Sequence, residues 1–446
     1  MLSNYLKLAW RILGRKKFFT FISLFGTSFT LGILMVIISF LQSELGTSEP
    51  LSNKDQLIYL NTLALQRRYF DTIITVDTIV EMEEMKFDTT MEFKQRGRST
   101  WNSDMNNGIA EDYLSDLSSM EDETIFNYGA YHDVYVNGVK LTIQSMYTDP
   151  SHFKIFDYQL LEGRFMDKND MDQASKVMII NQDLAENYFG MRSGVTGKML
   201  EMDGSEYRII GVIKTVKKAV PFVGPDAFVP YTCANEDDQT SFYHGYYNVI
   251  FKRKANVSLK TAKKEIEAVA DLIPLDHPSK PEGYNEVVFR PQSYDEMFAK
   301  ALYYDEDEEK SYTVMKWVLI SLLSLFVLLP TLNLINLNVS RIMDRSSEIG
   351  VRKAYGAHQG NILAQFVTEN IVQTIIGGLI GLVLAISLIN LLNNSGALGD
   401  IYLIMNPKFY VYSLLATLFF GILSGLAPAY KMSKLHIVNA LKNNKI

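Results

Sequence analysis

The chain has 446 residues, of which 48% are hydrophobic and 21% are charged, and its formal net charge is −7. The charge is divided unevenly: residues 42–313 hold 28 basic and 46 acidic residues, and the rest of the chain holds the other 15 basic and 4 acidic ones. The acidic middle excludes a nucleic-acid-binding protein, because affinity for phosphate requires a basic surface. The single cysteine, Cys233, excludes an intrachain disulfide and a cysteine-based metal cluster.

Four uncharged runs are each long enough to cross a membrane. They have 22 to 24 residues and are Phe18–Leu41, Trp317–Val339, Ile371–Leu392 and Phe409–Tyr430. At about 1.5 Å per residue, a helix of this length covers the roughly 30 Å hydrocarbon core of a bilayer. No small-x-small cleavage site follows the first run, so it predicts a signal-anchor and not a cleaved secretory signal. We predict transmembrane helices at residues 18–41, 314–339, 367–392 and 409–430.

Basic residues near these runs predict the orientation of the chain in the membrane, because they favour the cytoplasmic side. They precede the first run, separate the second from the third and follow the fourth. The residues are Lys7, Arg11, Arg15, Lys16, Lys17, Arg341, Arg345, Arg352, Lys353, Lys431, Lys434, Lys442 and Lys445. We therefore expect residues 1–17, 340–366 and 431–446 in the cytoplasm, and the short loop 393–408 and the domain 42–313 on the other side.

The outer domain 42–313 has the pattern of an α+β fold. β-Branched and aromatic runs predict strands, and apolar residues at helical spacing predict an amphipathic helix at 259–272. Asn137-Gly138 and Asp203-Gly204 are typical of hairpin turns. Residues 293–310 are compatible with a helix and end in the acidic run 305–309, which leaves two alternatives: a stiff rod leading into the second span, or a flexible solvated linker.

Small residues recur at a spacing of four in the third and fourth predicted spans. The two pairs are Gly377 with Gly381 and Gly421 with Gly425. Such spacing places glycines on one face of a helix and allows close helix contact, although glycines are also common in membrane helices without such a role. No charge lies in the middle of a span, which disfavours an ion-coupled carrier.

The residues predict no catalytic site, cofactor or metal. The six histidines lack metal-ligand spacing, and Gly197-Lys198 lacks the glycine and the hydroxyl residue of a phosphate-binding P-loop. We expect the chain not to be an enzyme, and any ATP hydrolysis to belong to a partner.

Three segments resemble the MacB/FtsX-type permeases of ABC transporters. Residues 341–357 have the sequence RIMDRSSEIGVRKAYGA, which is similar to the cytoplasmic loop of that family, and Gln365-Phe366 with Glu369 is similar to the start of its next span. The tail 428–441 resembles the family's closing segment but departs from it at Met432 and Ile437. Residues 149–165, 180–190, 197–198 and 207–212 resemble its periplasmic core domain. The resemblance implies a two-lobed outer domain, with one lobe of residues 44–145 and 240–312 and an inserted lobe of residues 146–239.

The cytoplasmic loop fits a short helix. Ser347 can cap it, Glu348 and Arg352 are spaced for an ion pair, and Gly356 can end it in a left-handed turn. The resemblance implies that this helix couples to an ATPase through Glu348, Ile349, Gly350, Arg352, Lys353, Tyr355 and Gly356. The alternative is a basic loop that lies at anionic lipid headgroups.

The expected protein is therefore an α+β membrane protein with four transmembrane helices in the bacterial cytoplasmic (inner) membrane. By resemblance, it is a permease subunit that transmits the ATP-driven motion of a separate cytoplasmic ATPase to its periplasmic domain, for efflux or for lipoprotein or peptide export. The alternative is an FtsX-like regulator of a cell-wall hydrolase or of an antimicrobial-peptide sensing complex. Expected partners are the ATPase, a second permease copy or a paralogue, membrane lipid, and a periplasmic adaptor, outer-membrane channel or lipoprotein.

Overall fold

The chain forms two compact units. The computed structural model describes residues 17–47, 49–81, 84–127, 131–136, 138–216, 223–234, 241–305, 310–325, 328, 351, 355–356, 358–398, 402–404, 406–408, 410–412, 415, 418–419 and 422. One unit, the membrane unit, comprises Met1–Gly46 with Thr313–Ile446, and the other, the outer unit, is Thr47–Tyr312.

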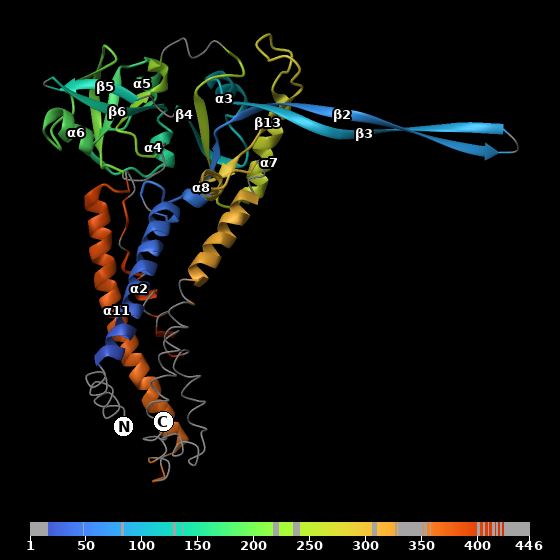
Figure 1. Ribbon diagram of the computed structural model, residues 1–446. Helices are drawn as coiled ribbons and strands as arrows, with labels where there is room; N and C mark the ends of the chain where they lie inside the picture. The colour runs from blue at the N-terminus through green and yellow to red at the C-terminus, as the bar shows by residue number, and fades with distance from the viewer. Residues whose placement is uncertain are drawn as a thin grey trace. The chain divides into compact units, whose positions relative to one another are not determined.

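Two helices of the membrane unit are, among the described residues, long and apolar enough to span a bilayer. They are α2, Lys17–Leu45, and α11, Gln359–Ser395, which has 37 residues (Figure 1). The mean hydropathy of their spanning segments is 2.2 and 2.5. At 1.5 Å per residue α11 is about 55 Å long, so it extends beyond the hydrocarbon core of a membrane. Residues 310–325 are also helical. The remainder of the second predicted span and most of the fourth lie outside the described residues.

The outer unit is built on an 11-stranded mixed sheet with the strand order β14-β1-β12-β4-β6-β11-β8-β10-β7, to which β5 and β9 add by pairing with β6 and β10. Its strands are β1 Leu57–Leu60, β4 Met120–Asn127, β5 Tyr131–Val136, β6 Val139–Thr148, β7 Leu160–Gly163, β8 Val177–Asn181, β9 Met199–Met202, β10 Ser205–Ile213, β11 Ala227–Pro230, β12 Tyr247–Arg253 and β14 Gln292–Ser293. The β6–β11 and β8–β10 pairs are parallel, and the others are antiparallel.

Short helices connect these strands. They are η1 Lys54–Gln56, α3 Asn107–Tyr113, α4 His152–Ile155, α5 Lys168–Asp172, α6 Gln182–Phe189, η2 Tyr231–Cys233, α7 Leu259–Val269, η4 Ala270–Leu272 and α8 Tyr294–Leu302. The predicted helix at 259–272 is confirmed as α7 and η4. α8 begins with a capping box between Ser293 and Glu296 and ends at an extended Tyr303. Of the two alternatives for residues 293–310, the unbroken helical rod is therefore excluded.

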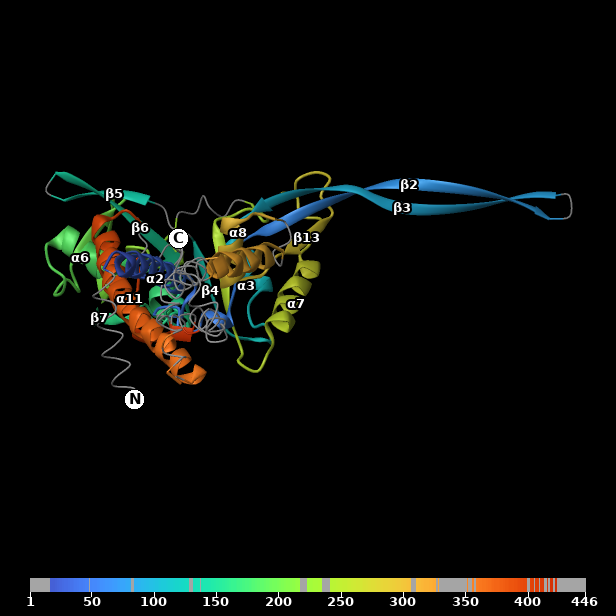
Figure 2. The ribbon, with the colours of Figure 1, turned by 60° about the horizontal axis from the view of Figure 1, so that its bottom comes forward.

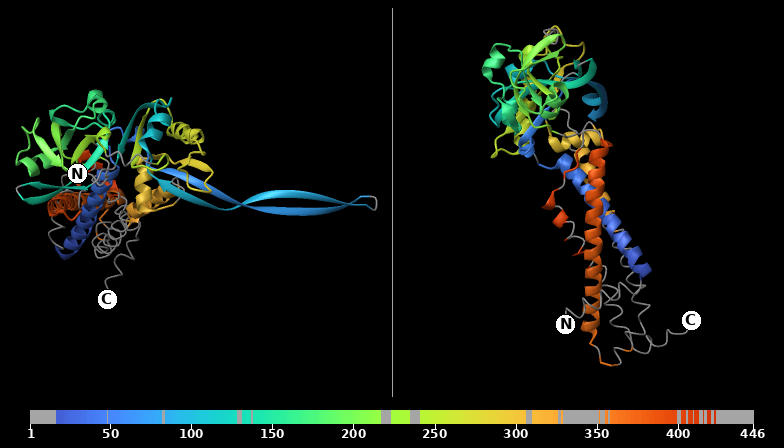
Figure 3. Two further views of the ribbon diagram at one scale, coloured as in Figure 1. Left: turned by 90° about the horizontal axis from the view of Figure 1, so that it is seen from above. Right: turned by 90° about the vertical axis from the view of Figure 1, so that its left-hand side faces the viewer.

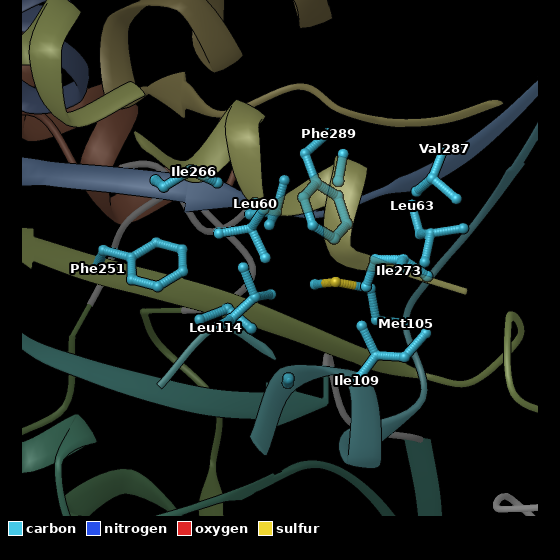
Figure 4. Close-up of a cluster of buried hydrophobic side chains, with 14 of the residues drawn as sticks. Leu60, Leu63, Met105, Ile109, Leu114, Phe251, Ile266, Ile273, Val287 and Phe289 are labelled. Atoms are coloured by element: carbon cyan, nitrogen blue, oxygen red, sulfur yellow. The ribbon is translucent and has the colours of Figure 1, made fainter. Parts of the chain in front are cut away.

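Clusters of buried side chains form the core of the outer unit, and two of them cover the two ends of its strand order. In Figure 4, Leu60 from β1, Phe251 from β12 and Phe289 from β13 (Glu286–Phe289) point into the first cluster, together with Ile109 and Ile266 from α3 and α7. The second cluster lies around β8, β10 and β11 and includes side chains of α6. Val134 and Ile143 belong to this second cluster, although the sequence places their segment in the first predicted lobe.

A long two-stranded ribbon, here called the arm, projects from the body of the outer unit (Figures 1, 2 and 3). Its strands are β2, Leu63–Glu81, and β3, Glu84–Ser103, which pair antiparallel over their whole length with one bulge next to Phe70. β13 pairs with β2 from Leu63 to Gln66 and so holds the root of the arm in a three-stranded sheet. The sequence prediction names no element over these residues.

Candidate functional site: the helix pair and the coupling segment

The predicted coupling segment, residues 347–357, lies mostly outside the described residues. This applies to Glu348, Ile349, Gly350, Arg352 and Lys353 among the predicted contact residues. Tyr355 is 89% exposed, and its backbone N–H donates to the carbonyl of Val351. Gly356 has a φ of +86°, the left-handed conformation that glycine adopts without strain and that ends a helix. His358 then caps α11, because its side chain accepts a hydrogen bond from the N–H of Gly360 at 3.3 Å.

Glycines of α11 lie against α2. A Cβ atom at Gly377 would lie 2.5 Å from Oγ1 of Thr27, and one at Gly381 would lie 2.8 Å from the carbonyl oxygen of Ser28. Gly32 of α2 faces Gly381 in return. The absence of side chains at these positions lets the two backbones approach closely, as in small-residue contacts of membrane helices. Gly421 and Gly425, the other predicted pair, lie outside the described residues.

The two helices run in the same direction. Residue numbers rise together along the contact, from Thr27 against Gly377 to Gly32 against Gly381. At the far end, the Ser39 hydroxyl donates to the carbonyl of Ile404 at 3.0 Å, and Ser43 makes the same kind of bond to Tyr402.

The loop that follows α11 is also tied back to that helix. Asn393 donates from Nδ2 to the carbonyl of Leu403 at 3.1 Å and accepts from its N–H at 2.9 Å. Because residues 402–404 bond to both α2 and α11, this loop holds the ends of the two helices together.

A buried polar stripe follows one face of the first half of α11. Its members recur at each turn of the helix and are Gln365, Glu369 with Asn370, and Gln373 with Thr374. Nε2 of Gln365 donates to Oε1 of Glu369 at 2.8 Å. The face that includes Leu379, Val383 and Leu391 is exposed instead. Since polar side chains of membrane helices face protein and apolar ones face lipid, this division orients α11 with its stripe toward the interior of the membrane unit.

In the outer unit, the family-like segment that begins at Asp149 has a structural role. The buried carboxylate of Asp149 accepts hydrogen bonds from the N–H of Ile125, Ser151 and His152 and from the hydroxyl of Thr124, at 2.8 to 3.2 Å. Burial nevertheless raises the pKa of Asp149 to about 6. The group joins β4 to the start of α4.

His152 lies in an aromatic cluster next to this carboxylate. Its ring is buried and lies 4.6 to 6.2 Å, between ring centres, from Phe126, Phe153, Phe156, Tyr158 and Phe228. Burial lowers the pKa of His152 to about 3, so the ring is neutral at physiological pH. Its surroundings are those of a packed core and not of a solvent-accessible catalytic base.

The segment around Gly163 is also structural. Arg164 donates to both carboxylate oxygens of Asp170, at 2.6 and 2.8 Å, and this bond lowers the pKa of Asp170. Gly163 has a φ of +78° and lies so close to the backbone of β10 that no side chain fits. These family-like residues thus hold β7 against β10.

Among the residues that the structure describes, no group of His, Cys, Asp and Glu is arranged to hold a metal ion. Cys233 is half-buried, its thiol donates to the carbonyl of Ser175, and burial raises its pKa, so it lacks the character of an activated nucleophile. Gly197 belongs to the Gly197-Lys198 pair, which does not match a phosphate-binding P-loop. It has a φ of +87°, and its N–H donates to the carbonyl of Ile209, so its role is structural.

Family models match most of the chain. The MacB-like periplasmic core domain matches residues 20–269, and the FtsX-like permease C-terminal domain matches residues 320–437. Among solved structures, the periplasmic region of MacB from Actinobacillus actinomycetemcomitans is similar, with 17% identity and a TM-score of 0.35 over 46% of this chain and 85% of that one. A domain of a putative permease from Porphyromonas gingivalis has 14% identity and a TM-score of 0.38 over 54% of this chain and 91% of that one.

Curated relatives are transport proteins. The ABC transporter permease YknZ of Bacillus subtilis is 26% identical over 75% of this chain and 76% of its own length. The pyoverdine export ATP-binding/permease protein PvdT of Pseudomonas savastanoi is 23% identical over 97% of this chain, which spans 58% of that protein. The macrolide export ATP-binding/permease protein MacB of Neisseria gonorrhoeae is 26% identical over 65% of this chain and 42% of its own length. With both family models matched in sequence order, the chain belongs to the MacB/FtsX-type permeases of ABC transporters.

Proposed function

We propose that this permease transmits the ATP-driven motion of a separate cytoplasmic ATPase to its periplasmic domain, for efflux or for lipoprotein or peptide export. Family membership implies an ABC ATPase partner, dimeric assembly and a place in the inner membrane with a periplasmic domain. The export direction follows two relatives, whose names state pyoverdine export and macrolide export.

The observation that carries this proposal is the close, parallel contact of α2 and α11. The predicted coupling segment directly precedes α11, and α2 ends one residue before the chain leaves the membrane unit for the outer unit. Glycine contacts and the loop at residues 402–404 join the two helices over much of their length. A displacement applied at the start of α11 would therefore move α2 with it, because a closely packed helix pair transmits strain and does not absorb it.

The direction of the helices supports the predicted membrane topology. With α2 as the first span and α11 as the third, one crossing, the second span, lies between them, so the two helices must run in the same direction. Their parallel contact is what this arrangement requires. The polar stripe on α11 supports burial of this helix within a larger bundle, which is the place of a transmitting helix rather than of a peripheral anchor.

The test is a double substitution in the coupling segment, Glu348→Ala with Arg352→Ala, in the full-length permease expressed together with its ATPase. We expect the ATPase to be lost from the purified complex while insertion of the permease into membranes is unchanged. Arg345→Ala is the matched control, since it removes a neighbouring cationic residue but spares the predicted pair. Equal ATPase recovery with the double variant and the wild type contradicts the proposal. Equal loss with the control supports the lipid-headgroup alternative.

A further inference from the structure

A groove runs along the free edge of β13. This strand, Glu286–Phe289, is the edge of the three-stranded sheet and pairs with β2. Among the described residues, no hydrogen bond joins its other edge to any part of the chain. The groove beside this edge has a volume of about 840 Å³. Because an edge strand presents a row of backbone N–H and C=O groups, those that point away from β2 are available to a partner.

The helix α7 forms the opposite wall of the groove. It lies beside β13 in two views (Figures 1 and 2), and its side chains Ala262 and Ile266 share a buried cluster with Val287 and Phe289 of the strand. This packing holds the helix and the strand edge in a fixed relation. An extended peptide that enters the groove would add a strand to the sheet with α7 at its side.

The ion pairs around the groove show which ends of the helix and the strand lie together. Lys263 of α7 pairs with Glu296 near the start of α8. Since α8 closely follows β13 in the chain, the first half of α7 lies at the end of β13, where Arg290 follows the strand. The second half of α7 and η4 lie toward the start of β13. There Glu286 is paired with Arg68 of the arm.

The remaining charges give the groove a basic end and an acidic end. Lys260 and Lys264 of α7 line it together with Arg290, at the end of β13. Glu267 and Asp271 line it toward the start of the strand. Among the described residues, none of these five side chains makes an ion pair. The groove therefore favours a ligand that carries acidic groups at one end and basic groups at the other.

We propose that this groove binds an extended peptide segment of a partner protein, which adds to β13 as a fourth strand. The segment places acidic side chains next to Arg290 and basic ones next to Asp271. The free edge argues for a peptide, because a strand is the ligand that matches a row of backbone donors and acceptors. A second copy of this chain would bring its own α7 to the edge that α7 already flanks. The inference concerns the outer unit alone and goes beyond the proposed function.

The experiment measures the binding of fluorescein-labelled hexapeptides to the full-length permease in detergent, by fluorescence anisotropy. An extended hexapeptide is about 20 Å long, which is about the length of the helical wall from Leu259 to Asp271. Two peptides with blocked ends are compared. Each has two glutamates at one end, two valines in the middle and two lysines at the other end, and they differ in which end comes first. We expect saturable binding of at least one, and its order of charges gives the direction of the added strand.

The peptide control is the bound hexapeptide with every backbone nitrogen methylated. It keeps the side chains but loses the backbone donors, so we expect it to bind at least about tenfold more weakly. The result shows whether the peptide is bound as a strand or only through its charges.

The protein variant Lys264→Glu with Arg290→Glu reverses the basic end of the groove. We expect it to bind the hexapeptide at least about tenfold more weakly, and a peptide with lysines in place of the glutamates to regain the loss. Lys168→Glu with Lys214→Glu is the matched control, because it makes the same change of net charge at two exposed lysines outside the groove. If thermal unfolding shows that the groove variant is not folded, Lys264→Glu alone, at an exposed position of α7, replaces it.

Three results each overturn the proposal. They are no saturable binding of either hexapeptide up to about 1 mM, equal binding of the methylated peptide, and equal binding by the folded groove variant. A groove variant that changes the mass of the permease complex while no peptide binds assigns the edge to a second copy, and this also overturns the proposal. Recovery of the ATPase with each variant tests the proposed function separately, since the groove lies in the outer unit.

Discussion

The close contact between α2 and α11 predicts that Gly381→Ala destabilises the membrane unit. The added Cβ would lie 2.8 Å from the backbone oxygen of Ser28 and 3.1 Å from Cβ of Leu31, both shorter than relaxed contacts of about 3.5 Å. The helices must therefore separate by about half an ångström over this stretch. Overpacking of this kind costs about 1–3 kcal/mol, and the higher helix propensity of alanine offsets at most about 1 kcal/mol of it. With about 2 kcal/mol as the central overpacking cost, we expect a net loss of at least about 1 kcal/mol.

The assay is thermal unfolding of the full-length permease in detergent, followed by circular dichroism. Gly360→Ala is the matched control, because a Cβ there makes only an ordinary contact, 3.4 Å from Nδ1 of His358. Gly377→Ala should fall between the two, since it meets the hydroxyl of Thr27, which can rotate away but then gives up its bond to the carbonyl of Leu24. A Gly381→Ala variant that is as stable as Gly360→Ala would refute the close packing.

Three further predictions concern the outer unit and the topology. Burial lowers the pKa of His152 to about 3 and raises that of Asp149 to about 6, so between pH 6 and 4 the unfolded state holds about one more proton than the folded state at the histidine, and the folded state holds most of one more at the aspartate. The two contributions to the pH dependence of the free energy of unfolding therefore nearly cancel. Asp149→Asn should leave the contribution of the histidine alone, so that the free energy of unfolding falls by about 1.4 kcal/mol for each pH unit of acidification in that window. Urea unfolding at several pH values measures this, and a flat profile contradicts the assignment. Gly163→Ala should lower the midpoint of the same unfolding curve, because its φ is positive and its Cβ would strike the backbone of β10; unchanged unfolding would contradict this. In a Cys233→Ser background, an impermeant thiol reagent applied to intact cells should label Asn394→Cys but not Asn443→Cys, and the reverse pattern would overturn the predicted orientation.

The sequence predicts correctly those turns and helices whose formation depends on residues close together in the chain. The Asp203-Gly204 pair predicts the β9–β10 hairpin, and in the structure both residues have positive φ, at 51° and 70°. The spacing of apolar residues over 259–272 predicts α7, which buries Ala262, Ile266 and Val269. Each of these depends on residues within one or two turns of the chain, which is the range over which periodicity is informative.

The polar stripe of α11 was not predicted, although its signal is present. Gln365, Glu369 and Gln373 recur every four residues, but they straddle the start of the uncharged run used to predict the third span. The charge of Glu369 ends the uncharged run that predicts the third span. The prediction therefore assigns one helix of 37 residues partly to a cytoplasmic loop and partly to a span. Whether a polar side chain there faces protein or lipid depends on the neighbouring helix, which sequence periodicity alone does not identify.

The arm was missed because the residues between its two strands match no common hairpin motif. Hairpins are usually found from Asn-Gly or Asp-Gly between two strand-like runs, whereas residues 82 and 83 are Met and Glu. The alternation of apolar and charged residues is clear only after the pairing of the two strands is known, since the bulge beside Phe70 shifts the partner strand by one position. Without knowledge of the pairing, residues 63–103 show frequent charges and isolated apolar residues, a pattern that is also compatible with a solvated loop.

The register also shows that the two faces of the arm differ. Thr72 pairs with Phe93 and Ile74 with Met91, so these side chains share one face of the ribbon, whereas Glu92 lies on the other. Met91 and Phe93 are 62% and 67% exposed. A signal of this kind depends on pairing residues of two strands across the ribbon, and a pattern read along a single strand does not contain that pairing.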